Sequence, residues 1–524
     1  MTTAQEEIFR GTTTCQTTRK VIIAGAGPSG LLAAILLLRR NEKPGATIRY
    51  HVTLVDPGPD FGNLDEEGLK RHRSWMISLS THGLSSVQQV PGLYEDYIEK
   101  SGLHLSALSL GMGKWAFDVT FPEDLKENLN IDRNCICGAL AHYLNEHFLE
   151  SGNLTLHYNT KALFVDSEFR RLVVRSETPE SRDEGSNLSG LIPLDYDLLL
   201  GCDGIRSVVR NAFITNHRDF QFTLRDAFSM MKSLHITRPS NVDEGRFFIL
   251  FNCLPNMTSF TIPERGGQLN FACGYQLDKP CDAAMLSDDP KVVRQYLTKH
   301  FKAFDLDCDE VALEWVRQPW NTVQQVHCNF YHSTLLQALL LGDAAHATLP
   351  NLGQGMNQAL VDAVVLNDLL DKYEEDLDEV LPAFSKERVK EGNALTDLSF
   401  HTYSLSRSMQ LEIIMRQSIR RFLKRIFPFF VDIEPMVAIA QGMKLSEAYD
   451  RVSKQGYFHR SRRINDDIMR THFERQSGMI KDEPRVSMVQ LLQPFGCSLL
   501  ASAMIAGVLA VCFFPWENIN EYLA

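Results

Sequence analysis

Three glycines near the start of the chain have a spacing that can bind the phosphates of a dinucleotide. Gly25, Gly27 and Gly30 follow the pattern G-x-G-x-x-G directly after the apolar run at residues 21–24. The first glycine permits a sharp turn out of a strand, the second lets a pyrophosphate approach the backbone, and the third lets a helix pack closely. Asp56 ends the next apolar run, where an acidic residue would accept a hydrogen bond from a ribose.

Two further pairs of an acid and a glycine follow apolar runs much later in the chain. Asp203 and Gly204 come after the run at residues 196–201, and Gly342 and Asp343 end a second run. The second pair leads into a loop and then a predicted helix at residues 358–373, where backbone amides would stabilise an anion. The residues that shape this loop are Pro350, Gly353, Gly355, Met356 and Asn357.

Two arginines could reach an anionic cofactor from other segments. Arg73 lies in the cationic stretch at residues 71–80, where a surface salt bridge is the alternative interpretation. Arg133 precedes a helical pattern of apolar residues, so it would sit near a helix start and could clamp a pyrophosphate with two hydrogen bonds.

The elements that must position these residues form an α/β pattern. Buried strands that run into glycine turns and helices predict a Rossmann-like domain with a parallel sheet. Residues 211–326 instead show mainly strand patterns, which predict a β-sheet domain inserted between cofactor-binding segments. The expected strands of this insertion include residues 247–251, 259–262 and 270–275, and a helical segment is expected near residues 292–301.

Composition excludes several classes of protein. The chain of 524 residues is 44% hydrophobic, which suits a large globular core, and its net charge of −12 argues against nucleic-acid binding. Eleven cysteines without a repeating spacing predict a reducing compartment rather than a disulfide framework. Cys135 and Cys137 do not have the spacing of a metal-binding motif, so no metal site is predicted.

The three glycine and aspartate groups, in this order and at these distances, resemble the single-component FAD-dependent aromatic hydroxylases. The stretches Gly-Asp-Ala-Ala-His-Ala at residues 342–347 and Gly-Gln-Gly-Met-Asn at residues 353–357 strengthen the resemblance, which covers residues 20–410. It implies an FAD-binding domain, an inserted substrate domain and a C-terminal helical region. The expected division is a flexible N-terminus (1–19), the FAD-binding domain (20–210 and 327–380), the substrate domain (211–326), the helical region (381–485) and a membrane-anchor segment (486–516).

The resemblance also implies roles for residues around the flavin. Asp343 would hold the ribityl chain, and the amides of residues 353–357 would face the pyrimidine edge of the flavin. Arg73 and Arg133 match positions that touch FAD. His346 is expected either to pack behind the flavin as a structural residue or to transfer a proton.

The substrate site is less fully defined by the resemblance. Asn357 and Tyr403 match positions near the substrate, although Tyr403 could also be a buried aromatic residue with a satisfied hydroxyl. Family members that act on an aromatic amino acid bind its carboxylate with an arginine located between the segments that contain Arg73 and Arg133. This chain has no arginine at residues 74–132. Either Lys114 substitutes for it, or the substrate differs.

The reaction implied by the resemblance is hydroxylation of an aromatic ring. NADPH or NADH reduces FAD, O2 adds to the flavin to give a C4a-hydroperoxide, and an OH group passes to the substrate. No protein nucleophile is required, so no catalytic residue is assigned. Two alternatives stay open: a flavoprotein epoxidase or hydroxylase of a membrane-soluble isoprenoid, and a flavin-dependent binding or regulatory protein.

The C-terminal region contains a long uncharged segment. Residues 486–516 include no charged side chain, and residues 495–516 suffice to span about 30 Å of hydrocarbon as a helix. The segment predicts a tail anchor with the enzyme facing the cytosol, and the resemblance suggests the mitochondrial outer membrane. A buried helix on the catalytic domain is the alternative. Basic clusters at residues 420–425 and 460–463 could face a membrane or lie on solvated helix faces.

Overall fold

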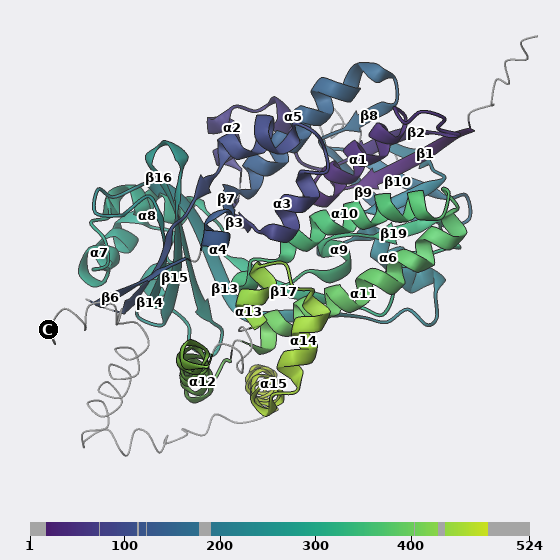
Figure 1. Cartoon of the computed structure of the whole chain (residues 1–524). Coiled ribbons are helices and arrows are strands. Elements are labelled where there is room, and N and C mark those ends of the chain that lie inside the picture. Colours follow the sequence, from purple (N-terminus) through teal and green to yellow (C-terminus); the bar gives the residue numbers. More distant parts are fainter. Residues whose placement is uncertain are drawn as a thin grey trace, which may run out of the picture.

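The computed structural model describes most of the chain as a mixed α/β protein (Figure 1). The described residues are 17–72, 74–112, 115–121, 123–177, 190–402, 404–427 and 435–479. The predictions for Arg73, Lys114, Tyr403 and the segment 486–516 lie outside this part of the chain.

A six-stranded sheet forms the centre of the cofactor-binding region. Its order is β18-β19-β12-β1-β2-β8, and every neighbouring pair is parallel except β18 with β19. The strands are β1 (Thr17–Ala24), β2 (Ile48–Val55), β8 (Leu154–His157), β12 (Leu198–Gly201), β18 (His332–Ser333) and β19 (Ala338–Leu340). Three strands predicted far apart in the sequence, β1, β12 and β19, are therefore direct neighbours.

Helix α1 (Pro28–Arg40) follows the first glycine turn and packs in the interior of the molecule. Proline at its first position suits a helix start because that residue needs no backbone hydrogen bond. All residues from 31 to 38 are buried, which explains the continuous apolar sequence. Helices α5 (Arg133–Phe148) and α10 (Gly355–Lys372) pack against it, so α1 is covered by protein on several sides.

A second sheet of seven strands forms the inserted region. Its order is β17-β13-β16-β15-β14-β5-β6, and helices α7 (Pro290–His300) and α8 (Cys308–Arg317) pack on it around the buried Trp315 (Figure 1). Strands β5 and β6 come from well before the expected insertion, so two separate segments build this sheet. The strands are β5 (Ala107–Met112), β6 (Trp115–Thr120), β13 (Phe222–Thr237), β14 (Arg246–Leu254), β15 (Met257–Glu264), β16 (Gln268–Gln276) and β17 (Asn321–Cys328).

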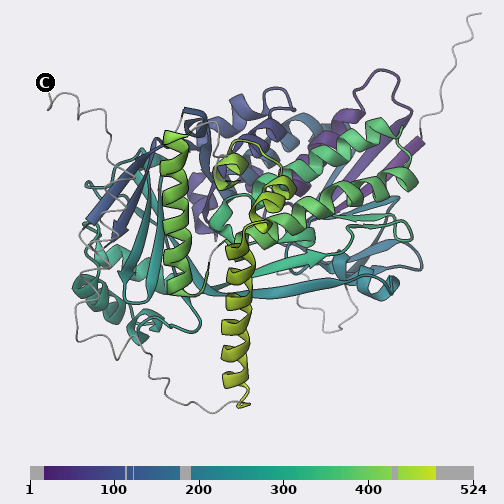
Figure 2. The same ribbon diagram turned by 60° about the horizontal axis from the view of Figure 1, so that its bottom comes forward.

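Two small sheets, five short helices and a group of C-terminal helices also belong to the fold. The short helices are α2 (Glu66–Arg71), α3 (Thr81–Val87), α4 (Glu123–Lys126), α6 (Val208–Asn216) and α9 (Asp343–His346). The first sheet contains β3 (Met76–Leu79), β7 (Leu129–Asp132) and β4 (Leu103–His104), and the second contains β9 (Thr160–Asp166), β10 (Arg171–Ser176) and β11 (Leu191–Asp195). The C-terminal helices are α11 (Leu377–His401), α12 (Arg407–Ile426), α13 (Pro435–Ala440), α14 (Leu445–Ser453) and α15 (Gly456–Gln476). Figure 2 shows α12 and α15 extending on one side of the molecule. Within the described ranges, none of the helices is both long and apolar enough to cross a membrane.

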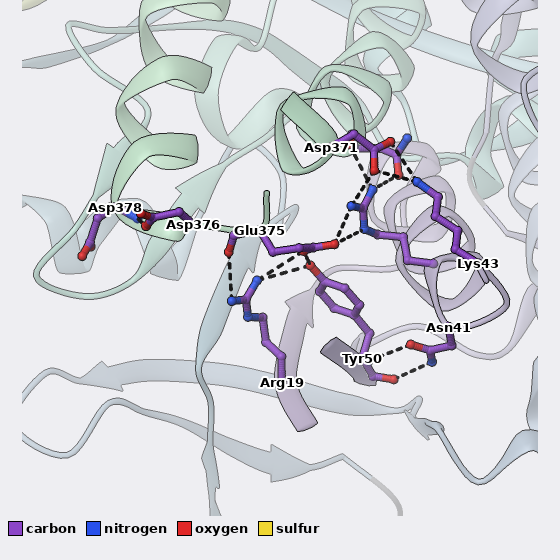
Figure 3. A network of polar contacts seen from close by, with 10 residues as sticks. Arg19, Asn41, Lys43, Tyr50, Asp371, Glu375, Asp376 and Asp378 are labelled. Carbon is purple, nitrogen blue, oxygen red and sulfur yellow. Dashed lines mark hydrogen bonds and ion pairs between the residues drawn. The ribbon is translucent and has the colours of Figure 1, made fainter. Parts of the chain in front are cut away.

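A network of polar contacts joins α1 and β2, at the start of the cofactor-binding region, to the end of α10 and the turn that follows it (Figure 3). Arg40, only 4% exposed, donates to Glu375 Oε1 at 2.9 Å through Nε and to Asp371 Oδ1 at 2.8 Å through Nη2. The hydroxyl of Tyr50 donates to the other oxygen of Glu375. Burial raises the pKa of Tyr50, and the charge of Glu375 raises it further, so this hydroxyl keeps its proton. The network joins α1 and β2 to the turn between α10 and α11.

We predict that Arg40→Ala destabilises the protein by about 3 kcal/mol because it leaves the Glu375 carboxylate without its main partner in a poorly solvated site. The matched control is Lys43→Ala. Lys43 also pairs with Asp371, but the two side chains are 47% and 50% exposed, so the loss should stay below about 1 kcal/mol. Chemical denaturation measures both free energies of unfolding. Equal losses in the two variants would contradict the assignment of the network.

Candidate cofactor site

The three predicted motifs meet at one edge of the six-stranded sheet. Gly25, Asp203 and Gly342 follow β1, β12 and β19, whose carboxyl ends lie side by side. The amide of Cys202 donates to the carbonyl of Ala24 at 2.8 Å, which places the first two loops in direct contact. In sheets of this type, ligands bind outside the carboxyl ends of the strands. The structure thus brings these distant parts of the chain together at one edge of the sheet.

Two glycines are required by the packing of this edge. Gly25 has a φ of +107°, and a Cβ atom on it would lie 2.2 Å from the carbonyl oxygen of Cys202. A Cβ atom on Gly30 would lie 2.0 Å from the carbonyl oxygen of Gly25. Both distances are far below van der Waals contact. Any larger residue would therefore push apart the strand, the turn and α1.

Gly27 differs from its two neighbours because the protein itself does not require a glycine there. Its φ of −77° is accessible to any residue. A Cβ atom on it would meet only the Nη2 atom of Arg133, at 4.0 Å. The space in front of Gly27 is therefore free for a ligand that approaches the backbone closely.

A cavity of about 150 Å³ opens beside Gly27. Asp56 lines it, and the two oxygens of its carboxylate accept hydrogen bonds from the amides of Ala26 and Gly58, each at 2.7 Å. These bonds fix the carboxylate and leave lone pairs for a further donor. The full lining is Ala26, Gly27, Leu31, Asp56, Pro59, Phe61, Arg133, Ala141 and Tyr158.

Tyr158 supplies a polar group that the protein leaves unused. Its hydroxyl is buried at this cavity close to the Asp60 carboxylate, but no described group meets it with good hydrogen-bond geometry. Burial raises the pKa of Tyr158, and the charges of Asp60 and Asp56 raise it further, so the hydroxyl stays protonated. A buried donor without a partner is costly, and a polar ligand would satisfy it. Together with the carboxylate and the arginine, it fits the adenosine diphosphate part of FAD.

Arg133 is the first residue of α5, as the sequence predicts. Asp132 caps this helix by accepting a hydrogen bond from the amide of Asn134 at 2.7 Å, and it also accepts one from the hydroxyl of Ser74 at 2.8 Å. The cap fixes the helix start and directs Arg133 to the cavity. Its contact with a pyrophosphate stays a prediction.

Asp203 combines a structural role with an unused acceptor. Its Oδ2 atom accepts hydrogen bonds from the amides of Val208 at 2.6 Å and Val209 at 3.3 Å at the start of α6 (Val208–Asn216). Its Oδ1 atom is buried and has no partner among the described residues. Burial raises the pKa of Asp203, against the effect of the Ser207 hydroxyl and of these two amides. Gly204 follows with a φ of +74° and with no protein atom near its Cβ position.

The third motif leaves a carboxylate at the surface of the site. Asp343 begins the short helix α9 (Asp343–His346), is exposed, and receives no hydrogen bond from a described residue. The loop after it contains a turn at Pro350–Leu352 and then Gly353 in the left-handed conformation, with a φ of +63°. Helix α10 begins at Gly355, where the first amides of a helix lack intrahelical partners. Both features fit the ribityl chain and the flavin ring.

Asn357 holds this loop in place. It is fully buried, and its Nδ2 group donates to the carbonyl oxygens of Ser78 at 2.9 Å and Gly353 at 2.8 Å. Its Oδ1 atom accepts from the amide of Ser80 at 3.0 Å. Both amide hydrogens are therefore engaged by the backbone. The structure gives Asn357 a positioning role, and its contact with a substrate stays a prediction.

His346 belongs to a buried ionic group behind the site. Its Nε2 atom lies 2.7 Å from Asp362 Oδ2, and Arg388 donates to Asp362 Oδ1 at 2.6 Å. The amide of Gly342 also donates to Asp362, at 2.8 Å. Burial alone would raise the pKa of Asp362, but the charges of His346 and Arg388 and these hydrogen bonds hold it at about 2. Of the two interpretations of His346, the structure supports the structural one.

Arg210 is a buried residue of this region that the sequence reasoning missed. It is 3% exposed and donates to the carbonyl oxygens of Ala344 at 2.8 Å and Ile205 at 2.6 Å. It thereby ties the loop after β12 to the helix after β19. An arginine one turn into a predicted helix is an ordinary surface residue in sequence, so no signal distinguished it.

A second buried charged group links α5 to the inserted sheet. His235 of β13 lies with Nδ1 2.8 Å from Glu264 Oε1 and with Nε2 3.9 Å from Asp132 Oδ2. Burial alone would lower the pKa of His235, but Glu264 and Asp132 raise it above its ordinary value, and Glu314 adds a smaller effect. Burial raises the pKa of Asp132. This group connects the start of α5 to β13 and β15 of the seven-stranded sheet.

Comparison with known proteins agrees with this geometry. The FAD binding domain family matches residues 106–399, more than half of the chain. Violacein synthase of Chromobacterium violaceum is 24% identical over 464 residues, which cover 85% of this chain and 100% of that protein. Kynurenine 3-monooxygenase of Sus scrofa is 26% identical over 438 residues, which cover 80% and 84%.

Solved structures share the fold at lower sequence identity. PqsL of Pseudomonas aeruginosa, in complex with 2-aminobenzoylacetate, has a TM-score of 0.56 and 18% identity and covers 74% of this chain and 96% of its own. The tetrameric form of 2-methyl-3-hydroxypyridine-5-carboxylic acid oxygenase has a TM-score of 0.55 and 18% identity, with coverage of 82% and 98%.

The fold and the site define a flavoprotein whose cofactor is FAD. More specifically, the chain belongs to the family of FAD-dependent aromatic hydroxylases and related monooxygenases. The residues present fit this cofactor. Tyr158 leaves a buried hydroxyl available in the cavity beside Gly27, and Asp203 leaves a buried oxygen available next to Gly204.

We predict that Gly27→Ala and Gly30→Ala separate cofactor binding from folding. Gly27→Ala should raise the Kd for FAD at least about tenfold, with the melting temperature of the apoprotein unchanged, because only the ligand needs the space. Gly30→Ala should lower the melting temperature of the apoprotein itself, because its Cβ atom would overlap the Gly25 carbonyl. FAD titration followed by flavin fluorescence, together with thermal unfolding, measures both effects. The same loss of apoprotein stability in both variants would refute the distinction.

We also predict a pH-dependent contribution of His235 to stability. Its folded-state pKa lies above the unfolded value, so its contribution is complete below about pH 6.5 and is lost as the pH rises through the folded pKa. Denaturation of the wild type and His235→Gln at pH 6 and pH 9 should show a smaller difference in unfolding free energy at pH 9. A difference that grows with pH would contradict the assignment.

Proposed function

We propose that the protein is a monooxygenase that uses NADPH or NADH and O2 to hydroxylate an aromatic substrate on bound FAD. The observation that carries this proposal is the meeting of three loops, after β1, β12 and β19, at one sheet edge beside the open Gly27 turn. The family to which the chain belongs supports the reaction class.

FAD, when bound, would supply the redox and oxygen chemistry, and the residues of the chain would orient it. Asp56, Arg133 and Tyr158 would hold the adenosine diphosphate end in the cavity. Asp343 and the amides at the start of α10 would hold the ribityl chain and the flavin ring. The seven-stranded sheet would cover the substrate and exclude water, which protects a reactive oxygen species from unproductive decay.

For the substrate, we propose an aromatic compound related to kynurenine, so that L-kynurenine would give 3-hydroxykynurenine. Several relatives at about one quarter identity are kynurenine 3-monooxygenases. The structural relative PqsL binds 2-aminobenzoylacetate, which shares the 2-aminobenzoyl group with kynurenine. Lys114 would bind the carboxylate as a point charge, since no arginine occurs at residues 74–132. Tyr403 would lie near the substrate.

A second candidate is a flavoprotein epoxidase or hydroxylase of an apolar, membrane-soluble substrate such as an isoprenoid. Two observations favour it: the missing arginine and the uncharged segment at residues 486–516. Such a substrate has no carboxylate and reaches the enzyme from a bilayer. In either case we propose that this segment anchors the protein with its catalytic part facing the cytosol, and the mitochondrial outer membrane is the proposed location.

The test is to incubate the purified full chain with FAD, NADPH or NADH, O2 and either kynurenine or an apolar polyene. We expect kynurenine to stimulate oxidation of the nicotinamide and to give a product heavier by one oxygen atom.

We also expect Lys114→Ala to raise KM for kynurenine at least about tenfold with a smaller effect on kcat, whereas Lys100→Ala should change neither. Oxygenation of the polyene alone would support the second candidate, and substrate-independent oxidation with unchanged compounds would reject both.

A further inference from the structure

Helix α12 carries an apolar stripe that the rest of the described chain does not cover. Leu411, Met415 and Leu423 are 49%, 49% and 39% exposed, and Ile419 and Ile426 are both 50% exposed. The spacing of three and four residues places these side chains on one face of the helix. We call this face, Leu411, Met415, Ile419, Leu423 and Ile426, the α12 stripe. A face of this kind on a surface helix marks an interaction site.

The same helix is strongly basic, in contrast to the whole protein. Its sequence contains six arginine or lysine residues and only one acid, Glu412, whereas the chain has a net charge of −12. Glu412 is already paired with Arg416, at 2.8 Å, and with Arg460 of α15. The basic residues of the helix are Arg407, Arg416, Arg420, Arg421, Lys424 and Arg425.

The position of α12 leaves this face accessible. The helix is attached to the molecule through Met409 and Ile413, which are 3% and 5% exposed. It also contacts α15, where the Arg416 guanidinium lies 6.0 Å from the centre of the Tyr457 ring. Both helices lie on the same side of the molecule in Figures 1 and 2. The described chain ends beyond α15 at Met479, which is 79% exposed.

We propose that α12 lies on an anionic membrane surface, with the α12 stripe inserted at the level of the lipid headgroups. An amphipathic helix of this composition binds membranes through its buried apolar area and through attraction of lysine and arginine to acidic lipids. Two other occupants fit less well. A second copy of the chain would bring one basic helix against another, and the uncharged segment at residues 486–516 would bring no negative charge to a helix that carries six basic residues and one acid. An anionic membrane surface complements both the apolar stripe and the basic residues.

Hydrogen–deuterium exchange on the full chain tests this proposal. The purified protein is compared alone, with vesicles of phosphatidylcholine, and with vesicles that also contain phosphatidylglycerol. We expect the amides of residues 407–427 to exchange at least about tenfold more slowly with the anionic vesicles, and this protection to weaken at high salt. Unchanged exchange in this segment with anionic vesicles would overturn the proposal.

A matched pair of variants separates the α12 stripe from general hydrophobic binding. The triple variant Leu411→Ser, Ile419→Ser and Leu423→Ser should lose the protection, whereas Leu313→Ser with Leu335→Ser should keep it. Leu313 and Leu335 are 63% and 55% exposed but lie elsewhere on the surface. If the α12 amides are protected without vesicles and the protection increases with protein concentration, the occupant is a second copy of the chain. If they are protected without vesicles equally at every concentration, the occupant is a segment of the chain itself. Either result would overturn the proposal.

The prediction is independent of the proposed reaction. FAD absorbance and oxygenated product can be measured in the same samples. If the substrate is hydroxylated but anionic vesicles do not slow exchange in α12, only the membrane contact is rejected. If the vesicles slow exchange in α12 but no product forms, only the proposed reaction is rejected.

Discussion

The structure depends on the close contact of three backbone loops at the carboxyl edge of one parallel sheet. Gly25 and Gly30 make this contact possible, because any side chain at either position would overlap a backbone oxygen. Hydrogen bonds between neighbouring strands then bring the loops that begin at Cys202 and Gly342 into line with the first turn. A dinucleotide site arises from this arrangement because an extended ligand can contact all three loops at once.

Buried charged groups stabilise the loops from behind. Asp362 receives hydrogen bonds from the amide of Gly342 and from Arg388, and its contact with His346 completes the group. Arg210 joins the second loop to the third. These groups are shielded from water, so each depends on the presence of its partners. Their role is to fix backbone positions, which leaves the chemistry to the cofactor.

The local signals in the sequence predicted the strands that precede the three motifs and the turns that follow them. Gly25, Gly204 and Gly353 have positive φ angles, and a Cβ atom on Gly30 would overlap the Gly25 carbonyl, so few residues other than glycine suit these positions. Contacts between segments far apart in the sequence were harder to predict. The pairing of β5 with β14 joins segments more than a hundred residues apart, and no periodicity encodes such a partner. The role of Asn357 also escaped prediction, since a side chain after a glycine loop can face either a ligand or the backbone of β3. Arg210 looked like a surface residue because one of its two acceptors, the carbonyl oxygen of Ala344, belongs to a segment far away in the sequence.

The most direct test of this account is an experimentally determined structure of the full chain with FAD. The account predicts one FAD molecule per chain, with the pyrophosphate beside Gly27, the adenosine in the cavity lined by Asp56 and Tyr158, and the flavin ring against the loop that contains Gly353. A cofactor bound at another surface, or a chain that takes up no FAD when it is supplied in excess, would contradict it.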